Sequence, residues 1–331
     1  MTEASLDIVA IGNAIVDVIA RSDDGFLASH SLIKGGMQLV DTDTAELLYA
    51  NMGPGMEVSG GSAANTLAGM AALGRSCGFI GQVRNDVLGK VFAHDIRALG
   101  IRFDTPAREA EPPTARCLIL VTPDAQRTMN TYLGASQFLP PAAIDAALIR
   151  SARILYLEGY LWDPEEPRAA MRGAIQVARE AGREVAFTLS DAFVIERHRD
   201  DFLALLNEGL IDILFANAVE IASLARLDDF EAAVAAIAPK VPRLVVTRSE
   251  QGAIALCNGE RSEVGAVPVA NIVDTTGAGD LFAAGFLAGH VAGRSAADCL
   301  KMGAIAAAEV ISHYGARPES DLRALMNGLS G

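Results

Sequence analysis

The sequence predicts an α/β protein built on a doubly wound, mostly parallel sheet that is flanked by helices. From residue 140 onwards, short apolar runs alternate regularly with longer amphipathic segments. The runs are almost continuously apolar, which is typical of strands buried on both faces of a parallel sheet. No long linker or repeat interrupts the 331 residues, so we expect a single domain over residues 1–331.

The N-terminal part begins with an apolar, β-branched run, Leu6–Gly12, which predicts a buried strand. In the next segment Asp17 interrupts an alternating apolar pattern. A carboxylate there is either exposed on a sheet face or directed into a site, and the strand context alone favours exposure. A short helix is expected over residues 41–51.

A first glycine-rich turn, Gly60-Gly61-Ser62, leads into a helix of small residues that extends to Leu73. The turn lacks the G-x-G-x-x-G spacing of a dinucleotide fingerprint, and no Gly-Lys-Ser/Thr of a Walker A loop follows it. Next we expect a strand over 78–83 and a helix over 86–99 that ends at Gly100.

Residues 101–133 differ in character from the rest of the chain, because four prolines separate short β-prone runs. This pattern predicts an antiparallel hairpin outside the main sheet. With residues 14–45, the segment is expected to form a small β-sheet that serves as a lid. The alternative is a set of proline-rich loops with edge strands.

The remainder of the chain alternates between helices and strands. Helices are expected at 141–150, 165–181, 193–207, 218–226, 229–238, 295–314 and 320–329, and strands at 154–157, 184–189, 211–216 and 244–247. Ligands of such sheets bind at the carboxyl ends of the strands. The polar positions that directly follow predicted strands are Gly12-Asn13, Tyr160, Ser190-Asp191, Asn217 and Thr247-Arg248.

A second glycine-rich turn, Gly277-Ala278-Gly279, follows a β-prone segment over 264–273 and precedes a helix. Small residues at a strand-to-helix junction let backbone N–H groups approach an anion. Asp280 would be unfavourable beside a phosphate unless it accepts a proton from an attacking hydroxyl. The alternative is a first-turn acid that complements the helix dipole. The two turns are expected at opposite ends of the sheet.

Composition excludes several classes of function. A formal net charge of -14 argues against a nucleic-acid-binding surface. The four cysteines and five histidines are scattered without metal-ligand spacing, as in a reducing compartment. No apolar run predicts a signal peptide or a membrane span, so a cytoplasmic protein with small-molecule partners is expected.

Three further positions have a functional and an ordinary interpretation. Asp17 could accept hydrogen bonds from a vicinal diol. Asn217-x-x-Glu220 could hold a water on Mg²⁺, or could be a plain helix cap. Arg127 could bind phosphate from the lid, or could be a solvated turn residue.

Together, Gly60-Gly61-Ser-Ala-Ala-Asn65 and Asp274-Thr-Thr-Gly-Ala-Gly-Asp280 resemble the two signatures of the ribokinase-like (PfkB) carbohydrate and nucleoside kinases. The resemblance covers essentially the whole chain, and Asn217-x-x-Glu220 falls between the signatures as in that family. The segments around Arg127, Glu158, Phe187–Phe193 and Asp212–Glu220 are most similar to those of adenosine kinases.

The resemblance implies a ribokinase-like fold with a β-sheet lid and an ATP- and Mg²⁺-dependent transfer of phosphate to the 5′-hydroxyl of adenosine. Asp280 resembles the catalytic base and Gly277, Ala278 and Gly279 the anion hole, with Arg127 near the phosphates. The groups that resemble acceptor-binding residues are Asn13, Asp17, Gln38, Gly60, Gly61, Asn65, Tyr160 and Phe193. Those that resemble the nucleotide and Mg²⁺ side are Asn217, Glu220, Thr247, Arg248 and Gly252. Arg248-Ser249 departs from the commoner Lys-Gly there. Asp274 and Thr276 match positions that bind a monovalent cation such as K⁺ in relatives.

Other functions stay open at this point. The acceptor could be a free sugar such as ribose or fructose, and the protein could be a monomer or a homodimer. A non-catalytic nucleoside- or sugar-binding regulator would not need Asp280, and a Rossmann dehydrogenase lacks its fingerprint.

Overall fold

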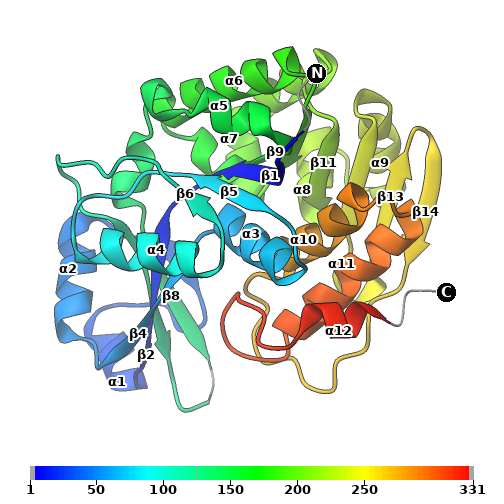
Figure 1. The fold of residues 1–331 in the computed structure, drawn as a ribbon. Helices are drawn as coiled ribbons and strands as arrows, with labels where there is room; N and C mark the ends of the chain where they lie inside the picture. Colours follow the sequence, from blue (N-terminus) through cyan, green and yellow to red (C-terminus); the bar gives the residue numbers. More distant parts are fainter. Residues whose placement is uncertain (1–3, 125, 328–331) are drawn as a thin grey trace.

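The computed structural model describes residues 4–124 and 126–327, which form a large and a small β-sheet surrounded by helices (Figure 1). The large sheet has nine strands in the order β14-β13-β12-β11-β10-β9-β1-β5-β6. Strands β12 through β6 are parallel, and β13 and β14 extend one edge as an antiparallel hairpin. The predicted doubly wound, mostly parallel sheet is therefore confirmed.

The strands of the large sheet have the following bounds: β1 (Leu6–Ile11), β5 (Cys77–Ile80), β6 (Arg102–Phe103), β9 (Ala152–Glu158), β10 (Glu184–Thr188), β11 (Ile213–Asn217), β12 (Arg243–Thr247), β13 (Ala253–Cys257) and β14 (Glu260–Val264).

Helices cover both faces of this sheet. One face carries α3 (Ser62–Ala72), α4 (Val87–Ala98), α10 (Ala278–Val291), α11 (Ala296–Val310) and α12 (Leu322–Met326). The other carries α5 (Ala146–Ser151), α6 (Glu165–Glu180), α7 (Ala192–Asn207), α8 (Ala218–Ala225) and α9 (Phe230–Ile237). In β1, Ile8 and Ala10 join the first core while Val9 and Ile11 join the second. Both faces of the central strands are thus buried, which explains their continuous apolar runs.

The small sheet has five strands in the order β3-β8-β7-β2-β4. Their bounds are β2 (Ile15–Arg21), β3 (Met37–Leu39), β4 (Gly55–Gly60), β7 (Ala115–Val121) and β8 (Arg127–Tyr132). Strands β7 and β8 are the hairpin predicted outside the main sheet. Strand β4 lies outside the two segments expected to form the lid, and β6, within residues 101–133, pairs with the large sheet instead. Helices α1 (Asp24–Ser29), α2 (Thr42–Asn51) and α4 lie beside this sheet (Figure 1).

Most helices begin at an acidic or hydroxyl side chain, but two begin at glycine. Asp41, Asp86 and Asp191, for example, each accept a hydrogen bond from an amide in the first turn of their helix. Helices α3 and α10 start after Gly61 and Gly277 and have no side-chain cap. Their first amides are therefore available to other groups.

Four expectations along the chain need correction. Beyond β14, residues 265–277 form an irregular loop in place of the β-prone segment expected over 264–273, since Pro268 cannot donate a ladder hydrogen bond. The helix expected over 141–150 is divided into a 3₁₀ turn and α5, because Asp145 caps α5. Helix α11 ends at Val310, four residues earlier than expected. The final helix spans Leu322–Met326, and residues 328–329 lie outside the described part of the chain.

Within residues 4–124 and 126–327, no helix combines the length and apolar character that crossing a bilayer requires.

Candidate active site

The two glycine-rich turns meet in one site. Asp280, in the first turn of α10, accepts a hydrogen bond at Oδ1 from Ser62 Oγ (2.6 Å) and at Oδ2 from Asn65 Nδ2 (3.0 Å). Helices α3 and α10 cover the same face of the sheet and pack against each other, with Gly69 close to Ala284. The expectation that the turns lie at opposite ends of the sheet is therefore wrong.

Both turns require glycine because a distant segment of the chain packs closely against each of them. Gly61 has φ +97°, and a Cβ there would lie 2.2 Å from the carbonyl oxygen of Asn13. Gly277 has φ +78°, and its Cβ would lie 2.6 Å from Ala316 Cβ. Each turn is thus fixed by a segment distant in sequence, at a backbone conformation that side chains disfavour.

The amides at the start of α10 differ in their partners. The N–H of Ala278 donates to Thr275 O (3.2 Å). Gly279 is exposed at the second helical position, where an α-helix provides no intrahelical acceptor. The helix N-terminus beside Asp280 can therefore accept an anion, chiefly through amides other than that of Ala278.

The environment of Asp280 suits a proton acceptor. Burial raises the pKa of this carboxyl group above its ordinary value, while hydrogen bonds from Ser62 and Asn65 and the charge of Arg317 act in the opposite direction. A raised pKa strengthens a carboxylate as a general base, provided that it stays ionised near neutral pH.

Asp17 faces the same cluster from β2. A Cβ on Gly60 would lie 2.5 Å from Asp17 Oδ2, so the absence of a side chain at Gly60 makes room for the carboxylate. Burial raises the pKa of Asp17 to about 6, although Arg317 and Arg127 lower it. The Asp17 side chain is half-buried over the turn, so it is directed into the cluster. The exposed position that strand context alone favours is therefore not observed.

Asn13 is held by two residues that the sequence did not single out as site residues. Glu158 Oε1 accepts hydrogen bonds from the amide N (2.8 Å) and Nδ2 (2.7 Å) of Asn13, and Oε2 accepts one from Ala63 N (2.8 Å). Ser136 Oγ donates to Asn13 Oδ1 (2.7 Å). Burial raises the pKa of Glu158 to about 7. The signal for Glu158 was an acid at the carboxyl end of a buried strand.

Asn65 has one unused hydrogen-bonding group in this cluster. Its Nδ2 donates to Asp280, but its Oδ1 is buried and has no donor among the described residues. Buried polar atoms without a partner are rare, and they often receive one from a ligand or water. A substrate hydroxyl group would supply the missing donor.

Arg127, the first residue of β8, forms an ion pair with Asp274 in the loop before α10. Asp274 Oδ1 also accepts from the N–H (3.0 Å) and Oγ1 (2.8 Å) of Thr276, and Oδ2 accepts from Gly315 N (3.0 Å). Three hydrogen bonds and the ion pair thus hold this carboxylate beside the second glycine-rich turn. The structure therefore places Asp274 and Thr276 together in the loop before α10.

The register of the small sheet separates Gln38 from Asp17. Gln38 is paired with Asn130, whose partner on β7 is Leu118, whereas Asp17 is paired with Cys117. Neighbouring positions on a strand point to opposite faces, so Gln38 lies on the face opposite Asp17. Its Nε2 donates to Asn130 Oδ1 (2.9 Å). Gln38 is therefore not part of the cluster, contrary to expectation.

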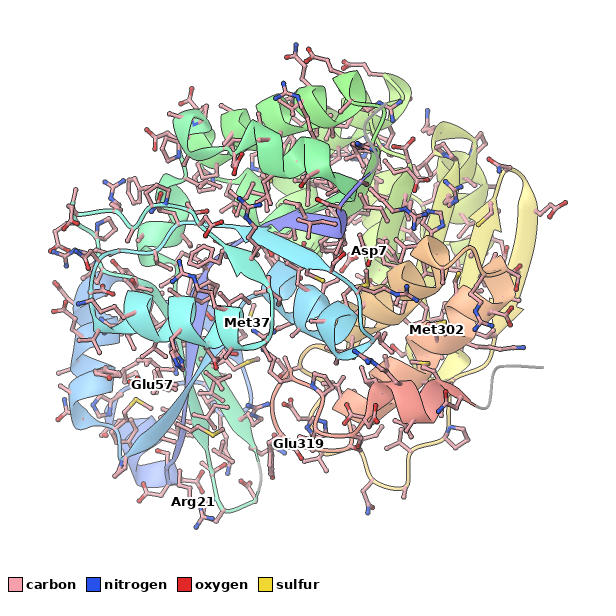
Figure 2. The ribbon with its side chains drawn as sticks, viewed as in Figure 1. Asp7, Arg21, Met37, Glu57, Met302 and Glu319 are labelled. Carbon is pink, nitrogen blue, oxygen red and sulfur yellow. The ribbon has the colours of Figure 1, made fainter. Side chains whose placement is uncertain are left out.

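The face that carries Asp17 is apolar and open. Met37 and Leu39 on β3 share this face and are 57% and 66% exposed. Figure 2 labels Met37 on the small-sheet side of the molecule, with Glu57 and Arg21. Elsewhere, Tyr160 is half-buried after β9, and Phe193 at the start of α7 is 68% exposed.

The residues expected on the nucleotide side follow β11 and β12, at the carboxyl edge of the sheet. Asn217 and Glu220 form a capping box, in which Glu220 Oε2 accepts from Asn217 N (3.0 Å) and Oε1 from Asn217 Nδ2 (2.6 Å). Burial raises the pKa of Glu220 to about 7. No second donor reaches either oxygen within the described part of the chain, so the pair fits a water on Mg²⁺.

Arg248 is engaged by its own surroundings. Its guanidinium forms an ion pair with Glu263 and lies 5.6 Å from the centre of the Phe230 ring. Thr247 is the last residue of β12, and Gly252, at φ +83°, precedes β13. The structure therefore places Thr247, Arg248 and Gly252 together at one end of the sheet.

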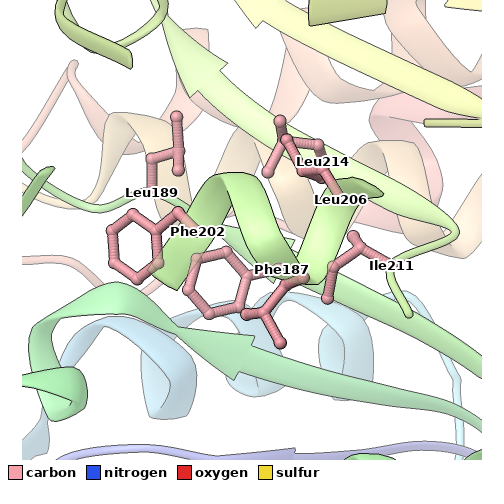
Figure 3. Close-up of a pocket in the computed structure, with 7 residues that line it drawn as sticks. Phe187, Leu189, Phe202, Leu206, Ile211 and Leu214 are labelled. Carbon is pink, nitrogen blue, oxygen red and sulfur yellow. The ribbon is translucent and has the colours of Figure 1, made fainter. Parts of the chain in front are cut away.

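A small apolar pocket under α7 is a part of the core (Figure 3). Its walls are seven buried side chains, Phe187, Leu189, Phe202, Leu205, Leu206, Ile211 and Leu214. They offer a polar ligand no hydrogen-bonding side chain, so this pocket is not the candidate active site.

Comparison with known proteins agrees with the fold. Residues 51–322 match the pfkB family carbohydrate kinase model. An adenosine kinase from Sinorhizobium meliloti is 47% identical, with a TM-score of 0.91 over 99% of this chain and 100% of that chain. A probable sugar kinase from Rhizobium etli is also 47% identical, with a TM-score of 0.91 over 98% and 99% of the two chains.

A 5-dehydro-2-deoxygluconokinase from Shouchella clausii is 30% identical over 265 residues, which are 77% of this chain and 81% of that protein. The family match spans both glycine-rich turns together with Asp280. The chain belongs to the pfkB family of carbohydrate kinases.

Proposed function

We propose that this kinase transfers the γ-phosphoryl group of ATP to the 5′-hydroxyl of adenosine and releases AMP and ADP. The observation that carries the proposal is the position of Asp280. This carboxylate is in the first turn of α10, beside an uncapped helix N-terminus, and Ser62 and Asn65 fix its two oxygens.

In the proposed reaction, Asp280 accepts the proton of the 5′-hydroxyl as its oxygen forms a bond to the γ-phosphorus. The bond between that phosphorus and the β–γ bridging oxygen breaks, and ADP leaves with the electron pair. Amides at the start of α10, with Gly277 and Gly279 the leading candidates, would stabilise the transferring phosphoryl group. Arg127, paired with Asp274 beside this turn, would contribute positive charge.

Mg²⁺ bound with ATP would neutralise phosphate charge, and Asn217 and Glu220 would hold it through water. Thr247, Arg248 and Gly252 would contact the nucleotide at the same edge.

On the acceptor side, Asp17, Asn13 and Asn65 would bind the ribose hydroxyls, with the unpaired Oδ1 of Asn65 accepting one of them. We further propose that the small sheet acts as a lid, which would exclude water from the transferring group. Its open apolar face, which includes Met37 and Leu39, suits a nucleobase better than a free sugar.

A sugar kinase is the second candidate, because the probable sugar kinase from Rhizobium etli is as similar to this chain as the adenosine kinase from Sinorhizobium meliloti. A coupled assay of ADP release with adenosine, inosine, ribose and fructose separates the two. We expect turnover with adenosine, whereas turnover with ribose or fructose alone would establish the second candidate. No ADP release with any acceptor would count against both.

A further inference from the structure

Arg317 lies in the loop between α11 and α12, far in sequence from both glycine-rich turns. Figure 1 shows this loop beside the small sheet, and Figure 2 labels Glu319, two residues after Arg317, in the same region. Three consecutive residues of the loop reach the site. Gly315 N donates to Asp274, Ala316 packs against Gly277, and Arg317 reaches the first turn.

The guanidinium of Arg317 bridges the two ends of the Gly60–Gly61 turn. Nε and Nη2 donate to Ser59 O (3.0 and 2.5 Å), Nη2 also donates to Ser59 Oγ (3.0 Å), and Nη1 donates to Ala64 O (2.7 Å). Ser59 precedes the turn and Ala64 follows it. Ser59 N donates to Asp95 Oδ2 (2.7 Å), so this strand end is held from both sides.

All four hydrogen bonds of Arg317 go to uncharged oxygens, so its positive charge is not cancelled by a bonded carboxylate. The charge acts instead on the surrounding acids. Arg317 lowers the pKa values of Asp17 and Asp280, and Asp17, Asp95 and Asp280 in turn favour the charged form of Arg317. A cation in this position opposes the mutual repulsion of the two site carboxylates.

We propose that Arg317 is a positioning residue, which clamps the Gly60–Gly61 turn against α10 and balances the negative charge that Asp17 and Asp280 bring together. The inference deepens the proposed phosphoryl transfer, on which it rests. Through Ser62 and Asn65, the clamp sets where the Asp280 oxygens lie. Through its charge, Arg317 keeps Asp280 ionised and able to accept a proton.

The test follows the titration of Asp280 directly by NMR of protein labelled with [γ-¹³C]aspartate, with the signal assigned from Asp280→Asn. The variants are Arg317→Gln, which keeps a donor without the charge, and Arg317→Lys, which keeps the charge. Other titrating groups that face Asp280 are Asp17, Glu158, Tyr156 and Tyr160, and they are the same in each variant.

Arg317→Gln should raise the titration midpoint of Asp280 by roughly one pH unit, and Arg317→Lys should return it close to the wild-type value. Arg323→Gln is the matched control, since Arg323 Nε donates to Ala72 O (3.1 Å) at the opposite end of α3. This control should leave the midpoint unchanged. An equal midpoint in Arg317→Gln and wild type, or an equal shift in both Arg317 variants, would overturn the inference.

Turnover measurements separate a failure of this inference from a failure of the proposed function. In an active wild type, the acidic limb of kcat/KM for phosphoryl transfer should move to higher pH in Arg317→Gln and recover in Arg317→Lys. A wild type that releases no ADP with any acceptor refutes the proposed function, whereas the NMR midpoints still decide whether Arg317 controls the charge of Asp280.

Discussion

At the scale of single residues, the site concentrates carboxylates that the fold makes costly to ionise. Burial raises the pKa values of Asp17, Glu158 and Glu220 to about 6, 7 and 7. When the pKa of an acid is higher in the folded state than in the unfolded state, protonation of that acid stabilises the folded protein. This stability is present below the ordinary pKa of each acid and is lost as the pH rises through the folded value.

Asp17→Asn should therefore change folding stability in a pH-dependent way. The substituted amide carries no charge, so stability relative to wild type should increase between pH 5.5 and pH 7.5, by on the order of 1 kcal/mol. Urea unfolding of wild type and variant at the two pH values measures this difference in stability. The titration of Glu158 and Glu220 does not affect the comparison, because both proteins contain these residues. A difference that stays constant or falls with pH would contradict the raised pKa.

The same substitution should weaken acceptor binding. Without the carboxylate, a bound diol loses a charged acceptor, and such hydrogen bonds contribute about 1.5–3 kcal/mol. The KM for adenosine should thus rise roughly 10- to 100-fold in Asp17→Asn. Steady-state kinetics at saturating ATP measures this, and an unchanged KM would remove Asp17 from acceptor binding.

The residues that could be predicted are those within local motifs, such as Asp280 with Gly277 and Asn65 with Gly61. Glu158 and Arg317 were not predicted as site residues, because their roles depend on distant partners. The bond from Asn13 to Glu158 spans 145 positions, and that from Arg317 to Ser59 spans 258. Sequence spacing carries no information about such contacts.

At the scale of elements, turn residues and strand register determine features that the apolar pattern of the chain does not predict. The β13–β14 hairpin was not predicted, although Asn258-Gly259 is a strong two-residue hairpin signal and both residues have positive φ. Gln38 lies on the face opposite Asp17, which the chain pattern did not predict, because β3 has only three residues and its pairing with β8 sets which face each one occupies.

The open face of the small sheet can be tested with adjacent positions on β3. If this face covers the nucleobase, Leu39→Asn should raise the KM for adenosine about 10-fold, since it removes roughly one buried leucine contact. Gln38→Ala, on the opposite face, is the matched control and should leave this KM within about twofold. Equal effects of the two variants would argue that the face does not bind the base.

The ion pair between Arg127 and Asp274 links the β7–β8 hairpin to the loop before α10. Arg127→Gln should remove positive charge near the transferring phosphoryl group and lower kcat by about 10-fold or more. Lys34→Gln breaks exposed pairs with Asp24 in α1 and Asp124 in the β7–β8 turn and should have little effect. Equal kcat values for Arg127→Gln and wild type would exclude a role for this arginine in transfer.

At the scale of the whole molecule, the parallel sheet could be predicted because each buried strand has a continuous apolar run and each crossover has a helical pattern. The relative position of the two glycine-rich turns could not. It depends on α3 and α10 packing on one face of the sheet, which follows from the strand order and from the chain path through the small sheet. That packing creates one site from segments 215 or more positions apart.

The most direct test of phosphoryl transfer with Asp280 as the base compares Asp280→Asn with Asp298→Asn. Asp298 has the same position in the first turn of α11 that Asp280 has in α10, so its substitution reports the loss of a first-turn acid alone. We expect Asp280→Asn to lower kcat roughly 10²- to 10⁴-fold with adenosine binding nearly unchanged by calorimetry, and Asp298→Asn to retain near-normal turnover. Near-normal turnover in Asp280→Asn would contradict the assignment of Asp280 as the catalytic base.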